Sequence, residues 1–426
     1  MTGEFFSLLA DLVRIPSISN AHEDVQRSAE AFADVLRAND CDDVQIIDAA
    51  VYGYRHVSHD LPTVLVYGHH DVQPVGRIDA WLSPPFEPEI RDGRMYGRGT
   101  SDDKGGVLAY LAATRLSRDC NVKFLIEGEE EIGSPSLGAL LDANRQLLQC
   151  DYAVLCDTPN FATGTPSLTY RLRGNVVIDV EVRCLERPAH SGKFGGVAPD
   201  AVQLLCTLLA NLELRGDADE SIDLPFDEDA FRRDVGILPG APLPSCPYER
   251  MWATPSMTIT GIEATPVAQA GNQINATARA RLSLRTVRGD EADILLRQLD
   301  QPFVTARVIS SADSWKTDHT HPLFAAARRA LARGFGKEAV MTGSGGTIGF
   351  VAPFARLLGD TPLLLTGVQD PPCNAHSENE SLHLGDWEKA MHSGAYLFHE
   401  LRLIGKSEGK SQKAEVSRVV LPPSAL

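Results

Sequence analysis

Short apolar runs alternate with helical segments along the first part of the chain, and this alternation restricts the possible folds more than any other feature. The predicted strands are residues 61–67, 122–126 and 152–156. The predicted helices are residues 25–38, 105–115 and 137–148. Strands that are apolar throughout and separated by helices are typical of a parallel sheet covered on both faces. We therefore expect an α/β domain with a mostly parallel sheet.

A different pattern follows in the middle of the chain. Residues 175–183 alternate apolar and polar side chains, which predicts a strand with one buried face. Further predicted strands at 256–260 and 274–284 and helices at 201–212 and 290–299 indicate the order strand-helix-strand-strand-helix-strand. From residue 321 the first pattern returns. We expect a small ferredoxin-like α+β domain at 171–315, inserted into a larger domain of residues 1–170 and 316–405, with a loose tail at 406–426.

The composition excludes several classes of protein. The net charge of −17 argues against nucleic acid and anionic membranes as partners. No apolar run approaches the roughly 20 residues that span a bilayer. The first residues lack the basic region and cleavage site of a signal peptide. The eight cysteines lie singly, without a C-x-x-C pair, as in a reduced intracellular protein, so we expect a cytoplasmic location.

Acidic residues and histidines follow the predicted strands, where parallel sheets gather ligands and catalytic groups. His69 and Asp71 are two residues apart and face the same way, so the carboxylate can hold the far nitrogen of a metal-bound imidazole. Asp102 precedes a helix that starts near Gly105. The acidic run at residues 129–131 leaves a buried strand, and crowded carboxylates need a cation or a proton there.

Asp157 follows the third strand, and His376 lies in a late polar turn. Each feature taken singly also fits a simpler structural role: a strand-end turn, a helix cap, a solvated turn or a surface histidine. Together, two histidines and three carboxylates form a suitable shell for a pair of divalent cations. The sequence contains neither H-E-x-x-H nor G-x-S-x-G, which disfavours single-zinc proteases and serine hydrolases.

Four motifs carry a family resemblance: GHHDVQP, GRGTSDDKGG, EGEEEIGS and AHSENE. In this order and spacing they resemble the di-metal metallopeptidase family of carnosinases, cytosolic nonspecific dipeptidase, glutamate carboxypeptidases, acetylornithine deacetylase and succinyl-diaminopimelate desuccinylase. The first and third motifs are closer to the dipeptidase branch. The resemblance runs from about residue 12 to residue 376. It implies that the larger domain is catalytic and that the inserted domain is a lid and a dimerisation domain.

The resemblance also implies two divalent cations per subunit, for which we expect Zn²⁺, with Mn²⁺ or Co²⁺ as alternatives. The implied metal ligands are His69, Asp102, Glu131, Asp157 and His376. In the family pattern, Asp102 bridges the cations, His69 and Asp157 complete one site, and Glu131 and His376 complete the other.

The remaining implied roles concern catalysis and substrate. Asp71 resembles the partner of the His69 ring, and Glu130 resembles the general base that activates water. His190 resembles a histidine that reaches across a homodimer to stabilise the oxyanion. Arg285 resembles the arginine that binds the substrate carboxylate. Two further substrate-binding positions are Asn272 and Thr347.

Three positions depart from the family pattern: His70, Asn275 and Gly349. We expect them to lie near the substrate and to affect specificity. The predicted function is hydrolysis of a peptide bond in dipeptides or short peptides with a free C-terminal carboxylate. The alternatives are an N-acyl amino acid deacylase, a metal-free binding protein on the same fold, and a nucleotide-binding enzyme built on GRGTSDDKGG, which lacks the spacing of known phosphate loops.

Overall fold

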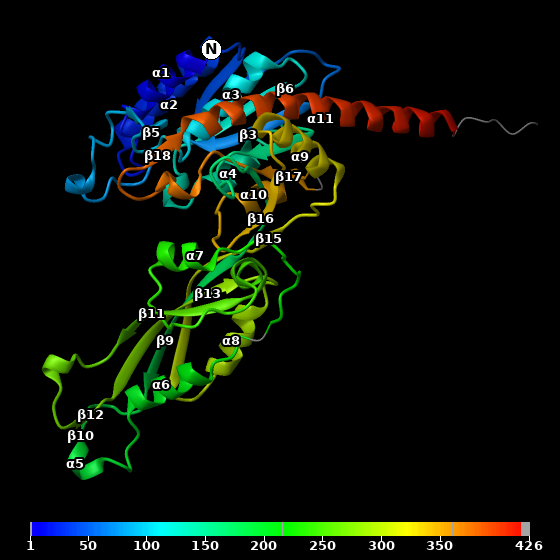
Figure 1. The fold of residues 1–426 in the computed structure, drawn as a ribbon. Helices are drawn as coiled ribbons and strands as arrows, with labels where there is room; N and C mark the ends of the chain where they lie inside the picture. Colours follow the sequence, from blue (N-terminus) through cyan, green and yellow to red (C-terminus); the bar gives the residue numbers. More distant parts are fainter. Residues whose placement is uncertain (1, 215, 360–361, 419–426) are drawn as a thin grey trace, which may run out of the picture. The chain divides into compact units, whose positions relative to one another are not determined.

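The computed structural model describes residues 2–214, 216–359 and 362–418 (Figure 1). The chain forms two compact units. The first contains Met1–Tyr170, Thr317–Thr342 and Gly349–Leu426, and the second contains Arg171–Lys316 and Gly343–Ile348. The segment Gly343–Ile348 thus belongs to the second unit, whereas the sequence placed it in the larger domain. Close packing explains this assignment, because a Cβ atom on Gly343 would lie 2.7 Å from the Trp252 side chain.

A nine-stranded sheet, in which every strand except β15 (Trp315–Lys316) lies wholly or partly in the first unit, forms the centre of that unit. Its strands are β1 (Asp43–Ile47), β2 (Ala50–Arg55), β3 (Thr63–His69), β6 (Asn121–Glu127), β7 (Tyr152–Leu155), β8 (Ser167–Leu172), β15 (Trp315–Lys316), β16 (Val340–Ser344) and β17 (Leu363–Leu365). The order is β1-β2-β6-β3-β7-β17-β8-β15, and β16 pairs with β8. The central strands β6, β3, β7 and β17 are parallel, and the antiparallel pairs lie towards the two margins. The predicted fold class is confirmed.

Helices pack on both faces of this sheet. They are α1 (Thr2–Val13), α2 (His22–Ala38), α3 (Lys104–Leu116), α4 (Leu137–Ala143), α9 (Pro322–Phe335), α10 (Val351–Leu358) and α11 (Leu384–Arg418). Val64 and Val66 of β3 belong to the core cluster formed with α1, α2, α3, α9 and α11. Tyr67 points to the opposite face, where its ring lies 4.5 Å from that of Phe350 and 4.7 Å from that of Phe354. Strand periodicity therefore distributes the apolar side chains between two helical layers.

Helix α11 corrects one expectation. The predicted loose tail began at residue 406, but residues 406–418 continue α11 as helix. This part of the sequence contains several Lys and Glu residues, which have high helix propensity even where no apolar stripe is present. Residues 419–426 lie outside the described part of the chain.

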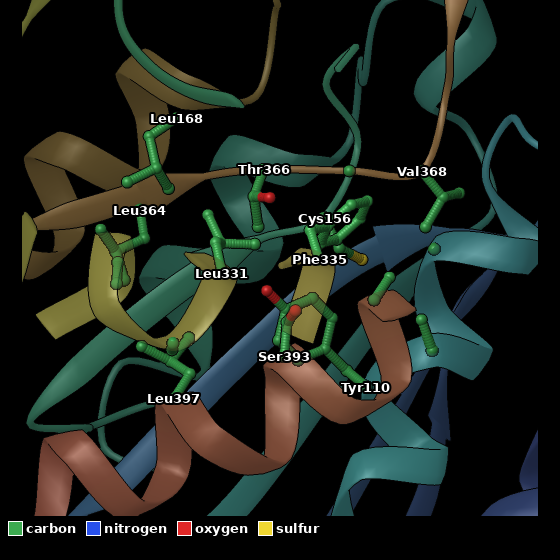
Figure 2. A pocket seen from close by; sticks show the side chains of 16 residues that line it. Tyr110, Cys156, Leu168, Leu331, Phe335, Leu364, Thr366, Val368, Ser393 and Leu397 are labelled. Atoms are coloured by element: carbon green, nitrogen blue, oxygen red, sulfur yellow. The ribbon is translucent and has the colours of Figure 1, made fainter. Parts of the chain in front are cut away.

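A small cavity of about 20 Å³ lies in the core between the sheet and helices α3, α9 and α11 (Figure 2). Its lining is mainly apolar and includes Leu331, Leu364 and Leu397, with Tyr110 and Ser393 on one side. This volume is enough for about one water molecule. The cavity is thus a packing feature of the core and is too small for a peptide substrate.

The second unit has an antiparallel sheet in the order β11-β13-β9-β14. These strands are β9 (Gly174–Arg183), β11 (Ser256–Glu263), β13 (Thr277–Thr286) and β14 (Val304–Ala312), and helices α6 (Ala201–Asn211) and α8 (Glu291–Leu299) accompany them. Buried residues alternate along β9 and β13 and form one core cluster with α6 and α8. This is the predicted α+β arrangement, with one face of the sheet left exposed.

Shorter elements complete both units. In the first unit, β4 (Glu89–Arg91), β5 (Arg94–Tyr96) and β18 (Ser381–His383) form a separate sheet. In the second unit, β10 (Ala189–His190) pairs with β12 (Gln273–Ile274), beside α5 (Ser191–Phe194). Helix α7 (Glu228–Val235) lies between α6 and β11 in the chain. The short turns are the 3₁₀ helices Ile78–Ala80, Glu130–Ile132, Val267–Gln269 and Pro371–Cys373 and the π-helix Glu249–Ala253.

None of the helices in the described ranges combines the length and the apolar character that are needed to cross a bilayer. All eight cysteines are free thiols. The cytoplasmic location that was inferred from cysteine usage stays a prediction.

Candidate metal centre

The carboxyl ends of adjacent strands bring the predicted ligands together in the first unit. Two groups of possible ligand atoms each lie within 4.8 Å of one another. The first consists of His69, Asp102 and Asp157, and the second of Asp102, Glu131 and His376. Because β6, β3 and β7 are parallel neighbours, the residues that follow them meet at one edge of the sheet. The two groups share Asp102, so one carboxylate can serve two ions.

His69 is completely buried at the end of β3. Its Nε2 lies 3.1 Å from Asp102 Oδ1 and 3.6 Å from Asp157 Oδ2. Its Nδ1 lies 3.0 Å from the backbone oxygen of Asp71. A proton on Nδ1 would satisfy that oxygen and leave the Nε2 lone pair facing the carboxylates. Burial lowers the pKa of His69, but hydrogen bonds with Asp102 and Asp71 outweigh it and raise this pKa well above the usual value.

Asp71 makes more contacts than the sequence suggested. Its carboxylate lies 3.4 Å from His69 Nδ1 and also accepts from the backbone N–H groups of Glu130 and Glu131, at 3.2 and 3.1 Å. The Ser19 hydroxyl donates to it at 2.7 Å. Asp71 therefore ties the His69 ring to the turn that carries two of the predicted site glutamates.

Asp102 is held by a residue whose role the sequence analysis missed. Glu380 is fully buried, and its carboxylate accepts from the backbone N–H groups of Gly99, Ser101 and Asp102 at 2.9, 3.0 and 3.1 Å. It also pairs with Arg98 at 2.7 Å. The signal was present in the sequence, because Glu380 is the last residue of AHSENE. Its partners, however, lie about 280 residues away in the chain.

The second group contains one exposed residue, His376. The His376 side chain is 57% exposed, and its Nε2 lies 2.9 Å from Asp102 Oδ2 and 3.1 Å from Glu131 Oε2. Hydrogen bonds with Asp102 and then Glu131 raise the pKa of His376 to about 10. The Gln73 amide donates to Glu131 Oε2 at 2.9 Å and to its backbone oxygen at 3.0 Å. Gln73 is another contributor that the sequence analysis did not name.

Asp157 completes the first group from the end of β7. The Gln369 amide donates to Asp157 Oδ1 at 2.9 Å and leaves Oδ2 directed toward His69. Burial and then the nearby Asp102 charge raise the pKa of Asp157 to about 7. Thus the Gln73 amide orients Glu131 in the second group, and the Gln369 amide orients Asp157 in the first group.

The three adjacent glutamates have different surroundings. Glu129 accepts a hydrogen bond from the Ser136 hydroxyl, and Glu131 faces His376 and Gln73. Among the described residues, the Glu130 carboxylate has no hydrogen-bond donor. Burial raises the pKa of Glu130 to about 9, and the charges of Asp157, Glu131 and Asp102 contribute to this increase.

This donor set fits divalent cations. Two imidazoles and three carboxylates match the nitrogen and oxygen ligands that borderline divalent metals prefer. The raised pKa values of Asp157 and Glu130 reflect buried negative charges that repel one another. Positive charge at this position would relieve that repulsion and keep the carboxylates ionised.

The predicted substrate-binding residues of the second unit form two separate pairs. His190 is exposed in β10, and its Nδ1 accepts from the Gly192 N–H at 3.0 Å. Asn272 lies beside it, because the Ser191 N–H donates to the Asn272 backbone oxygen at 3.0 Å.

The second pair lies at the end of β13. Arg285 Nη1 donates to Thr347 Oγ1 at 3.3 Å. In the sheet, Arg285 is paired with Asn175 near the start of β9, whereas Thr277 is paired with Arg183 at its end. The structure therefore joins Arg285 to Thr347 and His190 to Asn272, but it does not bring the two pairs together within the unit.

Two of the residues that depart from the family pattern, His70 and Asn275, make hydrogen bonds within the structure. His70 was expected near the substrate, but it is fully buried, with Nε2 2.9 Å from the Ala49 backbone oxygen and its ring against Phe32. Side chains alternate along a strand, so the residue after His69 points to the core. Burial lowers the pKa of His70 to about 4. Asn275 accepts from the Thr265 hydroxyl at 2.7 Å and donates its backbone N–H to Asp200 at 3.2 Å.

Comparisons with known proteins identify the family of the chain. A model of "Peptidase family M20/M25/M40" matches residues 65–401. The Cysteinylglycine-S-conjugate dipeptidase of Corynebacterium striatum is 31% identical over 402 residues, covering 86% of this chain and 88% of that protein. The Cys-Gly metallodipeptidase dug1 of Schizosaccharomyces pombe is 29% identical over 389 residues, covering 80% of each chain.

A solved structure is also similar. The crystal structure of human carnosine dipeptidase 1 matches with a TM-score of 0.70 at 26% identity, over 94% of this chain and 96% of that chain. These relatives confirm the resemblance to the dipeptidase branch that the motifs indicated. With the family model covering more than half of its length, the chain is a metallopeptidase that belongs to peptidase family M20/M25/M40.

Proposed function

We propose that this protein hydrolyses the peptide bond of dipeptides or short peptides that have a free C-terminal carboxylate. The observation that carries the proposal is the pair of ligand groups that share Asp102, with Glu130 adjacent to both. A binding protein would have no need for a base beside such a centre. Similar proteins that act on dipeptides support the substrate class.

In the proposed mechanism, Glu130 acts as the general base. Its carboxylate is the one of three adjacent glutamates that has no hydrogen-bond donor among the described residues, so it is available to accept a proton. After it has taken a proton from water, it can deliver that proton to the leaving amine. Asp71 contacts both the His69 ring and the backbone N–H of Glu130, so it fixes the position of the base relative to the metal ligands.

The proposed ligands are His69 and Asp157 for one cation, Glu131 and His376 for the other, and Asp102 for both. When bound, divalent cations lower the pKa of water and polarise a carbonyl group, which is the chemistry that peptide hydrolysis requires. We propose Zn²⁺ as the native metal because imidazole and carboxylate ligands suit it, with Mn²⁺ or Co²⁺ as alternatives.

The second unit supports a role for a homodimer. Arg285 is proposed to bind the substrate carboxylate, and His190 to stabilise the charge on the oxyanion. The eight residue steps of β13 from Thr277 to Arg285 span about 27 Å, at roughly 3.4 Å per residue. The β10–β12 ladder that carries His190 lies beyond the Thr277 end of this strand (Figure 1).

A dipeptide is only about 7 Å long when extended. The two pairs in one second unit are therefore too far apart to contact the same dipeptide. A second copy of the chain could supply His190 and Asn272 to a site that uses the Arg285 pair of the first. The exposed edge strand β11 offers a surface through which two copies can associate.

The decisive experiment is Glu130→Gln, which preserves size and removes the base. We expect turnover to fall by about 10²–10⁴-fold, while the bound metal per chain stays at the wild-type level. Glu129→Gln is the matched control, because Glu129 bonds to Ser136 and has no proposed catalytic role. If the Glu130 variant keeps near wild-type turnover, the assignment of the base is wrong.

The substrate class can be tested with a matched panel of dipeptides, dipeptide amides and N-acyl amino acids. We expect metal-dependent cleavage of dipeptides, which a chelator abolishes and added Zn²⁺, Mn²⁺ or Co²⁺ restores. Faster cleavage of N-acyl amino acids than of any dipeptide would identify the protein as a deacylase instead.

A further inference from the structure

Arg173 is a buried arginine of the second unit whose guanidinium contacts only neutral oxygen atoms. The residue is 9% exposed. Its Nε donates to the Gly345 backbone oxygen at 3.3 Å. Its Nη1 lies 3.0 Å from Ser256 Oγ and 3.1 and 3.3 Å from the backbone oxygens of Thr254 and Arg250. Among the described residues, Nη2 has no hydrogen-bond acceptor.

A buried cation of this kind normally has an acidic partner, because an uncompensated buried charge is strongly unfavourable. Arg171, two residues earlier and also buried, follows this rule and pairs with Asp219 at 2.5 Å and Glu220 at 3.2 Å. In the described ranges, no carboxylate lies within ion-pair distance of Arg173 or of Arg285. Arg173 and Arg285 therefore leave positive charge without a carboxylate partner in the described part of the chain, and an anionic group of a ligand can bind there.

Arg173 and Arg285 interact through the segment that separates them. The Thr347 hydroxyl donates to the Arg173 backbone oxygen at 2.6 Å and accepts from Arg285 Nη1 at 3.3 Å. Because a hydroxyl has one hydrogen, Thr347 has none left for a substrate and acts by orienting Arg285. Burial and then the charge of Arg285 lower the pKa of Arg173 to about 10, so the Arg173 guanidinium is cationic at neutral pH.

We propose that Arg173 is the second positive charge of the carboxylate-binding site and determines its preference for a free C-terminus. Arg285 contacts the substrate carboxylate, and Arg173 holds the Gly345 segment and adds a positive field behind it. This inference rests on the proposed function, in which that carboxylate is bound by Arg285. It makes Arg173 a positioning residue and assigns it no direct contact with the reacting atoms.

The test compares kcat/KM for a dipeptide with kcat/KM for the same dipeptide as a C-terminal amide. We expect Arg173→Gln to lower the ratio of these two values by about tenfold, mainly through KM of the free dipeptide, because a nearby unit charge is removed. Arg173→Lys keeps the charge and should keep most of the ratio. Arg171→Gln is the control: it breaks a buried ion pair of the same unit and should affect thermal stability without changing the ratio.

A second pair of variants covers the case in which Arg173→Gln does not fold. Ser256 accepts from Arg173 Nη1, so Ser256→Asp places a carboxylate beside the guanidinium and neutralises its field while Arg173 stays in place. We expect this variant to lower the same ratio. Asparagine has the shape of aspartate without its charge, so Ser256→Asn should leave the ratio near the wild-type value.

The outcomes separate this inference from the proposed function. An unchanged ratio in folded Arg173→Gln or in Ser256→Asp would overturn the role of Arg173, even if the dipeptide remains a good substrate. Equal losses in Arg173→Gln and Arg173→Lys would also overturn it, because they would indicate packing without a role for charge. Failure of the wild-type protein to cleave the free dipeptide would contradict the proposed function itself.

Discussion

Replacing Glu380 by glutamine changes almost no volume but should loosen the loop that carries Asp102. One carboxylate oxygen of Glu380 accepts from the Ser101 N–H at 3.0 Å, the Ser101 hydroxyl at 3.1 Å and the Asp102 N–H at 3.1 Å. The other accepts from Arg98 at 2.7 Å and the Gly99 N–H at 2.9 Å. An amide NH₂ group in either position faces at least two donors, so no rotamer of glutamine satisfies this site.

The expected magnitude follows from burial. The Arg98 side chain is 1% exposed and that of Glu380 is 0% exposed, so the substitution leaves a buried cation without its counter-charge. Breaking a buried pair in this way costs about 3–5 kcal/mol, against a total stability of roughly 5–15 kcal/mol for a protein domain. Since these contacts orient the backbone at Asp102, we also expect metal affinity to fall by about 10–100-fold.

Hydrogen exchange measured by mass spectrometry can report this change locally. We expect amide protection in peptides that cover residues 97–103 to fall by roughly 10²–10⁴-fold, the equivalent of the energy above. Glu378→Gln is the matched control, because Glu378 pairs with Arg77 on the surface and its loss should leave this protection unchanged. Wild-type protection and wild-type Zn²⁺ affinity in Glu380→Gln would refute the reasoning and show that other contacts hold the Asp102 loop.

Three further predictions concern the metal centre and the dimer. Asp102→Ala should lose both metals together, and a metal content still near two per chain, measured by elemental analysis, would exclude a bridging role. Gln369→Leu should weaken binding of the metal held by Asp157 by about 10–100-fold in a competition titration with a chelator, whereas equal affinity would show that the amide is dispensable. Mixing inactive His190→Ala with inactive Glu130→Gln should restore up to about half of the wild-type activity per heterodimer, because one of the two sites then has neither defect. Heterodimers that form without regaining activity would contradict action of His190 across the dimer.

The sequence was sufficient to predict the edge of the sheet where the site lies. Residues after β6, β3 and β7 were expected to meet because parallel strands present their carboxyl ends on one side, and the groups around His69, Asp102 and Asp157 do lie there. The alternating pattern of β9 likewise predicted a one-faced sheet in the inserted segment. Both conclusions depend on local periodicity, which neighbouring residues determine.

Only the tertiary structure gave a physical reason to distinguish residues that local periodicity treats alike, although family resemblance had already assigned different roles to Glu130 and Glu131. Glu129, Glu130 and Glu131 are adjacent and chemically identical, yet one bonds to Ser136, one faces His376, and one has no donor in the described part of the chain. Similarly, periodicity gave no reason to separate Arg171 from Arg173, although acidic residues surround the first and neutral oxygens the second.

The contacts of Glu380 and Gln369 could not be predicted for the same reason. Glu380 reaches Asp102 across 278 residues, and Gln369 reaches Asp157 across 212 residues. Sequence pattern determines which face of a strand or helix a side chain occupies. The partner that it meets there depends on how distant segments pack, because hydrogen bonds and ion pairs form between atoms a few ångströms apart whatever their separation along the chain.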